Sequence, residues 1–405
     1  MFEQALSGVK VIDLTHYISG PYCTKMLADY GADSIKVEKP GDGDGARKLG
    51  PFLKDEPHPE KSGFFAYLNT NKRGMTLNLK TETGKAIFLR LIADADILVE
   101  SYSPRVMPGL GLSFERLKEV NPRLVMVSIS NFGQTGPYKD FKASELILNA
   151  MGSEMFSRGI SIREPLKLGG NAVQFQAGSV SAVATSVGYW AALERGYGDH
   201  LDISIFETQI GSIDSRGSAL VGYSYSGKVA MRRVHGASRG YPNGVYMCAD
   251  GYIQIGHSAP EFFPRVLKML GNPEELGDPA MALPAGQMDD DLRGIFDAYF
   301  IPWCLERTKQ EIFLKAQAVG LPAGPINTME DIAKDAHFEA REFFVDVEHP
   351  VMGELKMPAA PFRMTASPWK VRRPAPLLGQ HNEEILGDLG FTKEDLVRLR
   401  ETGVI

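Results

Sequence analysis

The sequence predicts an α/β protein with a mostly parallel, doubly wound sheet, and two patterns carry this prediction. Short runs rich in Val, Ile and Leu alternate with helical patterns along the first half of the chain. A chain of 405 residues is also too long for one small core and long enough for two domains. Because strands that alternate with helices form parallel sheets covered by helices, we expect that architecture here.

The predicted elements follow one another through short connections. The expected strands are VKVIDL (9–14), SIKVEK (34–39), MTLNLK (75–80), DILVES (96–101), LVMVSIS (124–130) and DHLDISIF (199–206). The segment SGPYCTKMLADYGA between the first two strands is typical of a helix, because Pro21 lies near its start and Gly31 near its end. AIFLRLIADA predicts another helix, and the small-residue run 179–193 predicts a tightly packed one.

A second domain is expected in the middle of the chain. The composition shifts to Gly, Ser, Tyr and Arg over 224–240, which indicates a crossing between domains. A β-like segment, GVYMCADGYIQIG, and two helical patterns, FFPRVLKMLG and FDAYFIPWCLERTKQEIFLKAQA, follow it. The Pro- and Gly-rich stretch 321–361 predicts a return to the first domain. We expect the N-terminal part of a large domain in 1–223, a small domain in 224–325, and a linker with the return to the large domain in 326–405.

Composition and charge exclude several classes of protein. The net charge of −6 gives no basic surface for nucleic acid. Cys23, Cys248 and Cys304 form no CxxC pair and are expected to be buried thiols in a reducing compartment. The N-terminus has no basic segment followed by an apolar one, and the longest apolar stretch is far shorter than the ~20 residues of a membrane span. We therefore expect a cytoplasmic protein that binds neither nucleic acid nor membrane.

Familiar nucleotide and metal motifs are missing from the sequence. The first strand is followed by THYISGP and not by the GxGxxG turn of a dinucleotide site. GDGDGAR (41–47) resembles a calcium loop, but the position that would close such a loop holds Leu53 instead of Glu. We predict a flexible turn there. The eight histidines lack the i, i+4 spacing of a zinc helix, so no metal site is expected.

A series of segments in a fixed order resembles the family III CoA-transferases. They are VIDLTHYISGP, ADSIKVEKPGDGDGAR, NKRGMTLNLKTETGK, ADILVESYSPRVMPGLGL, SISNFGQTGPYKDFKASELILNAMG, GLPAGPINTMEDIAKDAHF and APLLGQHNEEILGDLGF. The resemblance implies a large Rossmann-like domain formed by both chain ends, a smaller inserted domain, and two chains that interlock as a dimer. It also implies coenzyme A thioesters as substrates, with no covalently bound cofactor.

The resemblance also implies a nucleophile that this chain lacks. Family members use an Asp, commonly in D-x-x-x-G, that attacks the acyl-CoA thioester ahead of a small-residue helix ending in AAL. Matching the glycine of that motif puts Gln174 at the nucleophile position, whereas counting back from the AAL sequence puts Gly178 there. Neither an amide nor a glycine can act as the nucleophile. No Asp or Glu occurs from Pro165 to Leu193, so no choice of alignment restores the acid.

Other positions match contact residues of the family. Those that resemble CoA-binding positions are Ile18, Lys39, Leu77, Lys80, Tyr102 and Lys142. The lysines could meet phosphates as point charges and Tyr102 could stack on adenine, although solvated lysines on ordinary loops are the alternative. One phosphate-binding arginine of the family falls at Gly109, and the nearby Arg105 has the wrong spacing. Glu145 matches an acidic position near the nucleophile, and its alternative role is to stabilise a helix start.

These observations leave three functional hypotheses. The first is a non-catalytic subunit of a heteromeric CoA-transferase, whose sister subunit carries the catalytic Asp. Such enzymes move CoA from an acyl-CoA such as succinyl-CoA to a carboxylic acid such as benzylsuccinate, in aromatic hydrocarbon degradation. The second is an active homodimer that uses Glu145 or another residue in place of the Asp. The third is a CoA-ester-binding or scaffold protein without transfer activity.

Overall fold

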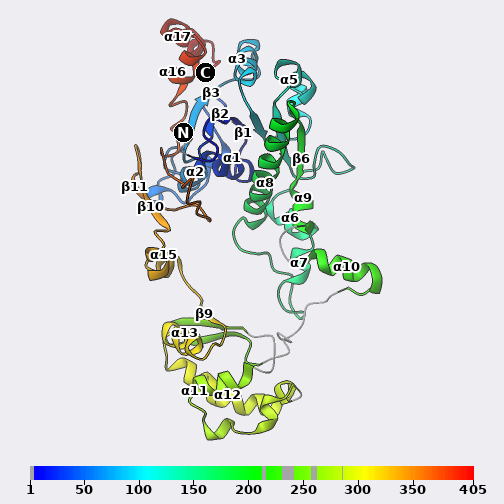
Figure 1. The fold of residues 1–405 in the computed structure, drawn as a ribbon, viewed down its shortest axis with the longest axis vertical. Helices are drawn as coiled ribbons and strands as arrows, with labels where there is room; N and C mark the ends of the chain where they lie inside the picture. The colour runs from blue at the N-terminus through cyan, green and yellow to red at the C-terminus, as the bar shows by residue number, and fades with distance from the viewer. Residues whose placement is uncertain (1–3, 212–215, 230–240, 257–261, 285) are drawn as a thin grey trace. The chain divides into compact units, whose positions relative to one another are not determined.

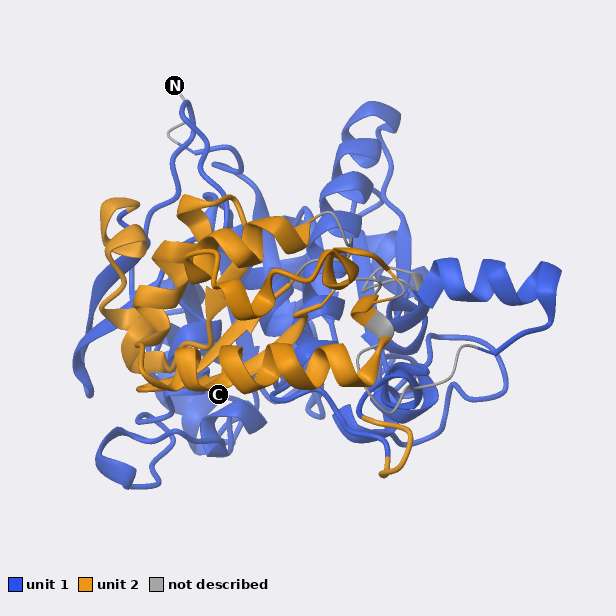
Figure 2. Cartoon of the chain, turned by 90° about the horizontal axis from the view of Figure 1, so that it is seen from below, with its two compact units in different colours: residues 1–159, 165–231, 342–405 blue, residues 160–164, 232–341 orange. Residues whose placement is uncertain are grey.

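The chain folds into two compact units, and each contains a sheet. The computed structural model describes residues 4–211, 216–229, 241–256, 262–284 and 286–405 (Figure 1). Unit 1 comprises 1–159, 165–231 and 342–405, and unit 2 comprises 160–164 and 232–341 (Figure 2). The sequence-based boundaries were 224 and 325 for the inserted domain. Much of the predicted crossing, 230–240, lies outside the described residues.

Unit 1 is built on a six-stranded sheet in which every described pair of neighbours is parallel. The strand order is β3-β2-β1-β4-β5-β6. The strands are β1 (Lys10–Leu14), β2 (Asp33–Glu38), β3 (Lys72–Thr76), β4 (Ile97–Glu100), β5 (Val125–Ser130) and β6 (His200–Ser204). This sheet confirms the predicted α/β class. Because the order reverses beside β1, the carboxyl ends of β1 and β4 form the edge where such sheets bind ligands.

Helices cover both faces of this sheet, as the alternation predicted. The helices of unit 1 are α1 (Ser19–Asp29), α2 (Gly63–Leu68), α3 (Glu82–Ala93), α4 (Val106–Gly109), α5 (Phe114–Val120), α6 (Glu145–Met151), α7 (Glu154–Ser157), α8 (Ala172–Arg195), α9 (Ile205–Gly211), α10 (Arg216–Ser226), α16 (Asn382–Asp388) and α17 (Lys393–Glu401). Alternate residues of β1 divide between the faces: Ile12 packs with α3, α5, α16 and α17, whereas Val11 packs with α1 and α8.

The contact between α1 and α8 is close because α8 carries small residues. A Cβ at Gly178 would lie 2.7 Å from the backbone oxygen of Ser19 at the start of α1. Farther along, a Cβ at Gly188 would lie 2.6 Å from the Leu201 side chain on β6. The predicted small-residue helix is therefore confirmed. It begins earlier than expected, at Ala172, and this places the candidate nucleophile position in its first turn.

Unit 2 has its own apolar core. Strands β7 (Gly244–Cys248), β8 (Gly251–Ile255) and β9 (Ala323–Pro325) form an antiparallel sheet. The helices are α11 (Phe263–Leu270), α12 (Asp290–Leu305), α13 (Lys309–Ala318), α14 (Met329–Ala333) and α15 (Ala336–Ala340). Phe296, Phe300 and Trp303 from one face of α12 fill its core.

The last segment of the chain returns to unit 1. Its hairpin pairs β10 (Phe344–His349) with β11 (Gly353–Pro358), and α16 then packs beside β3 (Figure 1). The side chain of Asn382 accepts a hydrogen bond from the Thr76 backbone N–H at 2.9 Å. Both ends of the chain therefore build one unit.

One difference from the sequence prediction has a physical cause. The third strand was expected at 75–80 but occupies Lys72–Thr76, because Lys72 is buried and paired within the sheet. Leu77 and Lys80 consequently lie beyond its carboxyl end. The predicted burial of Cys23, Cys248 and Cys304 is confirmed. In the described part of the chain, no helix is long and apolar enough to cross a membrane.

A candidate ligand cleft at the carboxyl edge of the sheet

A cavity of about 420 Å³ lies at the carboxyl ends of β1, β2 and β3 and the segment after β4. Leu14, Val37 and Leu77 provide an apolar floor, and all three are buried. The rim is polar. The charged residues that line the cavity are Glu38, Lys39, Asp42, Lys48 and Lys80, and the ring-bearing ones are His16, Tyr17 and Tyr102. An apolar pocket with a few convergent polar groups is the usual form of a small-molecule site.

The rim lysines remain accessible to solvent. The side chains of Lys39 and Lys48 are 65% and 66% exposed, and both approach Asp42. Lys39 Nζ lies 2.5 Å from Asp42 Oδ2, and Lys48 Nζ lies 3.6 Å from Asp42 Oδ1. Lys80 is also exposed. Such cations can exchange a weak surface partner for an anionic ligand because exposed ion pairs contribute little stability.

Tyr102 and His16 form a pair on one side of the cleft. His16 Nε2 lies 3.3 Å from the Tyr102 hydroxyl, and the two rings are 5.4 Å apart. The backbone N–H of Tyr102 donates to Glu100 Oε2 at 2.7 Å. Burial raises the pKa of Tyr102 to about 12, so its hydroxyl stays protonated at neutral pH. The Tyr102 ring is thus fixed from two directions.

The loop between β2 and the cleft is firmly anchored, in contrast to the flexible turn predicted for 41–47. Asp44 is buried and accepts the backbone N–H groups of Tyr17 at 2.9 Å and Ala46 at 2.8 Å. Lys36 Nζ lies 2.8 Å from Asp44 Oδ2. The carboxylate thus holds backbone donors, and the described residues contain no cluster of three or more potential metal ligands. The two aspartates of the GDGDGAR motif differ in environment: Asp44 is buried and holds the loop, whereas Asp42 is exposed.

A buried ion network supports the cleft from below. Lys72 Nζ donates to Asp13 Oδ2 at 2.9 Å and to Asn69 Oδ1 at 2.8 Å. The Thr24 hydroxyl donates to Asp13 Oδ2 at 2.6 Å. Burial by itself would raise the pKa of Asp13, but Lys36 and Lys72 hold it well below the ordinary value. Asp13 is therefore charged at neutral pH although it is buried.

The two candidate nucleophile positions lie on consecutive turns of α8. Gln174 is partly buried in the first turn, and the neighbouring Phe175 ring packs edge-on against Tyr22 at 5.0 Å. Gly178 faces the Ser19 carbonyl of α1 too closely for any side chain. Of the two positions, only residue 174 has room for a side chain. Neither carries an acid.

Glu145 holds the start of α8. Its Oε1 accepts the backbone N–H of Val173 at 3.1 Å and the Asn149 side-chain amide at 3.2 Å. Lys167 Nζ lies 3.9 Å from the same oxygen. The other oxygen, Oε2, is buried and has no hydrogen-bond partner in the described part of the chain. Glu145 therefore stabilises the positive end of α8, and it also lies in the first turn of its own helix, α6, as the alternative interpretation from sequence expected.

The structure brings four of the six predicted CoA-contact residues together. Lys39, Leu77, Lys80 and Tyr102 line the cleft. Ile18 does not, because it is buried at the start of α1, and the exposed Lys142 lies outside the residues that line it. The guanidinium of Arg105 engages Asp140 at 2.9 Å and does not occupy the rim.

Among the residues that line the cleft, sequence reasoning did not single out His16, Tyr17 and Lys48. His16 and Tyr17 belong to the THYISGP segment, and their position directly after a buried strand was the signal that could have identified them. Lys48 follows a loop whose conformation depends on the buried Asp44. No local sequence pattern predicts that this loop places Lys48 at the cleft.

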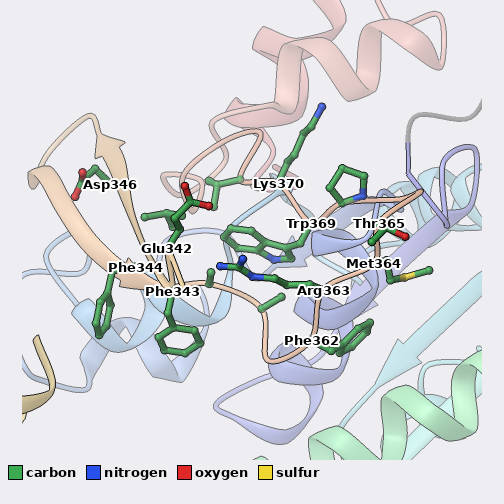
Figure 3. Close-up of a pocket in the computed structure, with 15 residues that line it drawn as sticks. Glu342, Phe343, Phe344, Asp346, Phe362, Arg363, Met364, Thr365, Trp369 and Lys370 are labelled. Carbon is green, nitrogen blue, oxygen red and sulfur yellow. The ribbon is translucent and has the colours of Figure 1, made fainter. Parts of the chain in front are cut away.

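A larger cavity, of about 710 Å³, lies elsewhere in unit 1 and contains none of the predicted residues. It is formed by 342–371, around the β10–β11 hairpin and the segment that follows. Figure 3 shows Trp369 and Arg363 near its centre, with Phe343 and Phe362 at its side. The Trp369 indole nitrogen is buried without a hydrogen-bond partner in the described residues. Such an aromatic surface is incompletely covered in the single chain.

Comparisons with known proteins find relatives that match the chain along nearly its whole length. The chain is 33% identical to succinyl-CoA–D-citramalate CoA-transferase of Chloroflexus aurantiacus over 402 residues, which covers 99% of this chain and 98% of the relative. It is also 33% identical to formyl-CoA:oxalate CoA-transferase of Streptomyces avermitilis over 417 residues, covering 99% and 100% of the two chains. A crystal structure of a CAIB/BAIF family protein from Brucella suis superposes with a TM-score of 0.84 at 28% identity, covering 96% of this chain and 100% of that chain.

The family model described as CoA-transferase family III matches residues 6–382. This match spans both segments of unit 1 that build the sheet and most of the return segment. It includes the strand ends that form the cleft and the start of α8. Together with the full-length relatives, it shows that this chain belongs to CoA-transferase family III.

Proposed function

We propose that this chain binds a coenzyme A thioester in the carboxyl-edge cleft and acts as the subunit without the nucleophile in a heteromeric CoA-transferase. The observation that carries the proposal is the contrast between a formed cleft and the start of α8. Four predicted CoA-contact residues line the cleft. The segment 165–193, where the family carries its Asp, contains no acid.

The cleft suits the charge and shape of coenzyme A. In this proposal Lys39 and Lys80 meet its phosphates, with Lys48 as a third cation on the same rim. The apolar floor of Leu14, Val37 and Leu77 accepts the less polar parts of the ligand. The charge of three lysines within one rim matches a ligand with several phosphate groups.

The missing acid determines what the chain cannot do alone. In the family reaction, a carboxylate oxygen attacks the thioester carbonyl carbon, the C–S bond breaks, and a mixed anhydride and a CoA thiolate form. The Gln174 amide is a poor nucleophile and Gly178 has no side chain, so this chain provides neither the attacking oxygen nor the covalent intermediate. A sister chain with an Asp must then supply them.

The second candidate is an active homodimer. Curated relatives at 33% identity along the whole chain are transferases. In addition, Glu145 contacts the backbone of Val173, the residue next to Gln174. Against it, one oxygen of Glu145 holds the Val173 N–H and the other is buried. An attacking carboxylate would need to leave this helix start. A CoA-ester-binding scaffold without any transfer role remains the third hypothesis.

Exposed apolar surface in unit 1 supports pairing with another chain. Val183, Val187 and Trp190 form one stripe along α8 and are 66%, 64% and 66% exposed. The aromatic cavity around Trp369 adds a second surface that the single chain leaves uncovered. Contiguous apolar surface on a protein of this size marks an interaction site. The proposed occupant is the sister CoA-transferase subunit, interlocked with this chain as the family resemblance implies.

The proposed acceptor is an aromatic carboxylic acid such as benzylsuccinate, with succinyl-CoA as donor. Next to Gln174, the Phe175 ring packs with Tyr22, Phe64 and Tyr67, which gives this region an aromatic surface. The relative from Chloroflexus aurantiacus is described as using succinyl-CoA. A place in cytoplasmic aromatic hydrocarbon degradation belongs to the same proposal.

Exchange assays test this function directly. We expect the chain alone to transfer no CoA between succinyl-CoA and benzylsuccinate or other dicarboxylic acids, and co-expression with an Asp-bearing sister to restore transfer. In the complex, Gln174→Ala should leave kcat nearly unchanged because residue 174 takes no part in the chemistry. Turnover by the chain alone that Glu145→Gln abolishes would instead establish the homodimer.

A further inference from the structure

Tyr17 combines a strained backbone conformation with an exposed side chain. Its φ is 66°, in the left-handed region that non-glycine residues with bulky side chains rarely adopt. The side chain is 56% exposed and lines the cleft. No hydrogen bond to its hydroxyl occurs in the described part of the chain. Strain of this kind persists where the surrounding structure enforces it, and it gathers at ligand sites.

Two features enforce the position of Tyr17. The buried carboxylate of Asp44 accepts its backbone N–H at 2.9 Å, and Asp44 itself is held by Lys36 at 2.8 Å. Gly45 leaves room for the ring, since a Cβ at that position would lie 2.5 Å from two ring carbons of Tyr17. A buried ion pair and a missing side chain therefore fix one exposed aromatic ring.

Along the chain, Tyr17 connects the cleft with the contact between α1 and α8. On one side it shares the cleft with Lys39, Lys48 and Lys80. On the other side, two residues later, Ser19 opens α1 and contacts the start of α8 beside position 178. Tyr17 is therefore the lining residue of the cleft that lies nearest along the chain to the contact between α1 and α8. A molecule with its phosphates on the lysines and its thioester toward α8 would run from the cleft toward this contact.

We propose that Tyr17 holds the pantetheine arm of a bound CoA thioester, packing its ring against the apolar chain between the nucleotide and the sulfur. This inference rests on the proposed function, because it requires CoA in this cleft. The ring provides apolar contact area, and this suits the alkyl segments of the pantetheine arm. Tyr102, whose hydroxyl and backbone are already engaged, is left to the nucleotide end.

Calorimetric titration of the full chain, in the assembly in which it purifies, tests the proposal with two ligands. CoA carries the pantetheine arm, and adenosine 3′,5′-bisphosphate carries only the nucleotide end. We expect Tyr17→Ala to weaken CoA binding about tenfold, an amount typical of a lost aromatic contact, and to leave the bisphosphate within about twofold. Tyr17→Phe should bind both ligands like the wild type, because the hydroxyl has no partner.

Further variants separate the ring from the strain and from folding. Tyr17→Gly relieves the positive φ and removes the ring, so it should bind CoA as weakly as Tyr17→Ala while its Tm is no lower. Gly45→Ala keeps the ring but displaces it, and should weaken CoA selectively. The matched control is Tyr197→Ala, which removes a ring that is 53% exposed at the opposite edge of the sheet and should change neither ligand.

Each remaining outcome has a definite meaning. An equal loss for CoA and the bisphosphate in Tyr17→Ala would place the ring on the nucleotide and overturn the proposal. Unchanged CoA binding in the same variant would also overturn it, while leaving CoA binding by the cleft intact. If the wild type binds neither ligand, the proposed function itself fails, and this inference fails with it.

Discussion

The two halves of the six-stranded sheet bury polar side chains in opposite ways. In the half made of β1, β2 and β3, Asp13 lies among the cations of Lys36 and Lys72, with all three side chains inaccessible to solvent. In the half made of β4, β5 and β6, Glu100 accepts the backbone N–H of Tyr102 at 2.7 Å, and the hydroxyl of its strand neighbour Ser128 lies 2.9 Å from His200 Nε2. In the described part of the chain, Glu100 has no ion-pair partner.

This difference determines the protonation of the two carboxyl groups. Burial acts on both and favours the neutral form. Two ammonium groups overcome it at Asp13 and keep the pKa well below its ordinary value. At Glu100 burial prevails and raises the pKa to about 7. Depth alone therefore does not decide whether a carboxyl group in this sheet is charged. Local cations decide it.

The largest expected effect comes from breaking the charged half. Asp13→Ala leaves Lys36 and Lys72 buried without their shared anion, so we expect a loss of about 3–5 kcal/mol in the free energy of unfolding. Urea denaturation followed by circular dichroism measures it through the midpoint, provided that the slope is unchanged. The purified assembly must be compared at one protein concentration, because association also stabilises the folded state.

The matched control for this variant is Asp94→Ala. Asp94 also pairs with a lysine, Lys10, but its side chain is 77% exposed. Exposed pairs contribute little, so the denaturation midpoint should hardly move. If Asp13→Ala were as mild as Asp94→Ala, the buried network would not stabilise the fold and the comparison between the halves would fail.

The second prediction concerns the half without cations and depends on pH. The pKa of Glu100 is about 7 in the folded protein, compared with an ordinary value of 4.5. The folded state therefore binds the proton more tightly, so the contribution of Glu100 is complete below about pH 4.5 and is lost as pH rises through 7. Glu100→Gln removes this contribution. We expect the stability of the wild type relative to Glu100→Gln to fall by up to about 3 kcal/mol between pH 4.5 and pH 8.

Denaturation midpoints of both proteins at several pH values measure this difference. The control is Glu119→Gln, which changes an exposed carboxylate on α5 that pairs with Arg116 and should give a flat difference. A flat difference for Glu100→Gln as well would show that Glu100 is charged in the folded state. That result would require a cation or water that compensates it.

The same contrast explains what the sequence could predict. Strands β1, β4 and β5 were found within a residue or two because each contains a short run of consecutive apolar residues, VI in β1, ILV in β4 and VMV in β5. Strand β3 was placed too late because it begins with KRG, a polar start that is typical of a loop. Lys72 belongs in the sheet only because Asp13 is there to receive it. Such partners are distant in sequence, so no local pattern reveals them.

The candidate site was predicted in the same uneven way. The lysines and Tyr102 were identified through family resemblance, and the structure gathers most of them in the cleft. The conformation of Tyr17 was not foreseeable, because a positive φ at an aromatic residue contradicts its local preference. It depends on Asp44, which the motif GDGDGAR presented as part of a flexible turn. The tertiary hydrogen bond overrides both expectations.

The smallest expected effect lies at the exposed rim of the cleft, where the charged half of the sheet meets solvent. Asp42 approaches both Lys39 and Lys48, and its side chain is 57% exposed. If those lysines receive the phosphates of CoA, the ligand must displace this carboxylate. Asp42→Asn should therefore increase CoA affinity by only about two- to threefold at low salt, because exposed pairs are weak. Stability should be unchanged.

Salt dependence makes this small effect decisive. Charges that are exposed are screened within about 10 Å at 0.1 M salt, so the gain from Asp42→Asn should shrink as salt rises. Glu56→Gln changes another exposed carboxylate, paired with Lys61 outside the cleft, and should not alter CoA affinity at any salt concentration. A gain that persists at high salt would mean that Asp42 acts by shape and not by charge. Weaker binding in Asp42→Asn would mean that the carboxylate positions the lysines for the ligand, and the rim would then resemble the buried network beneath it.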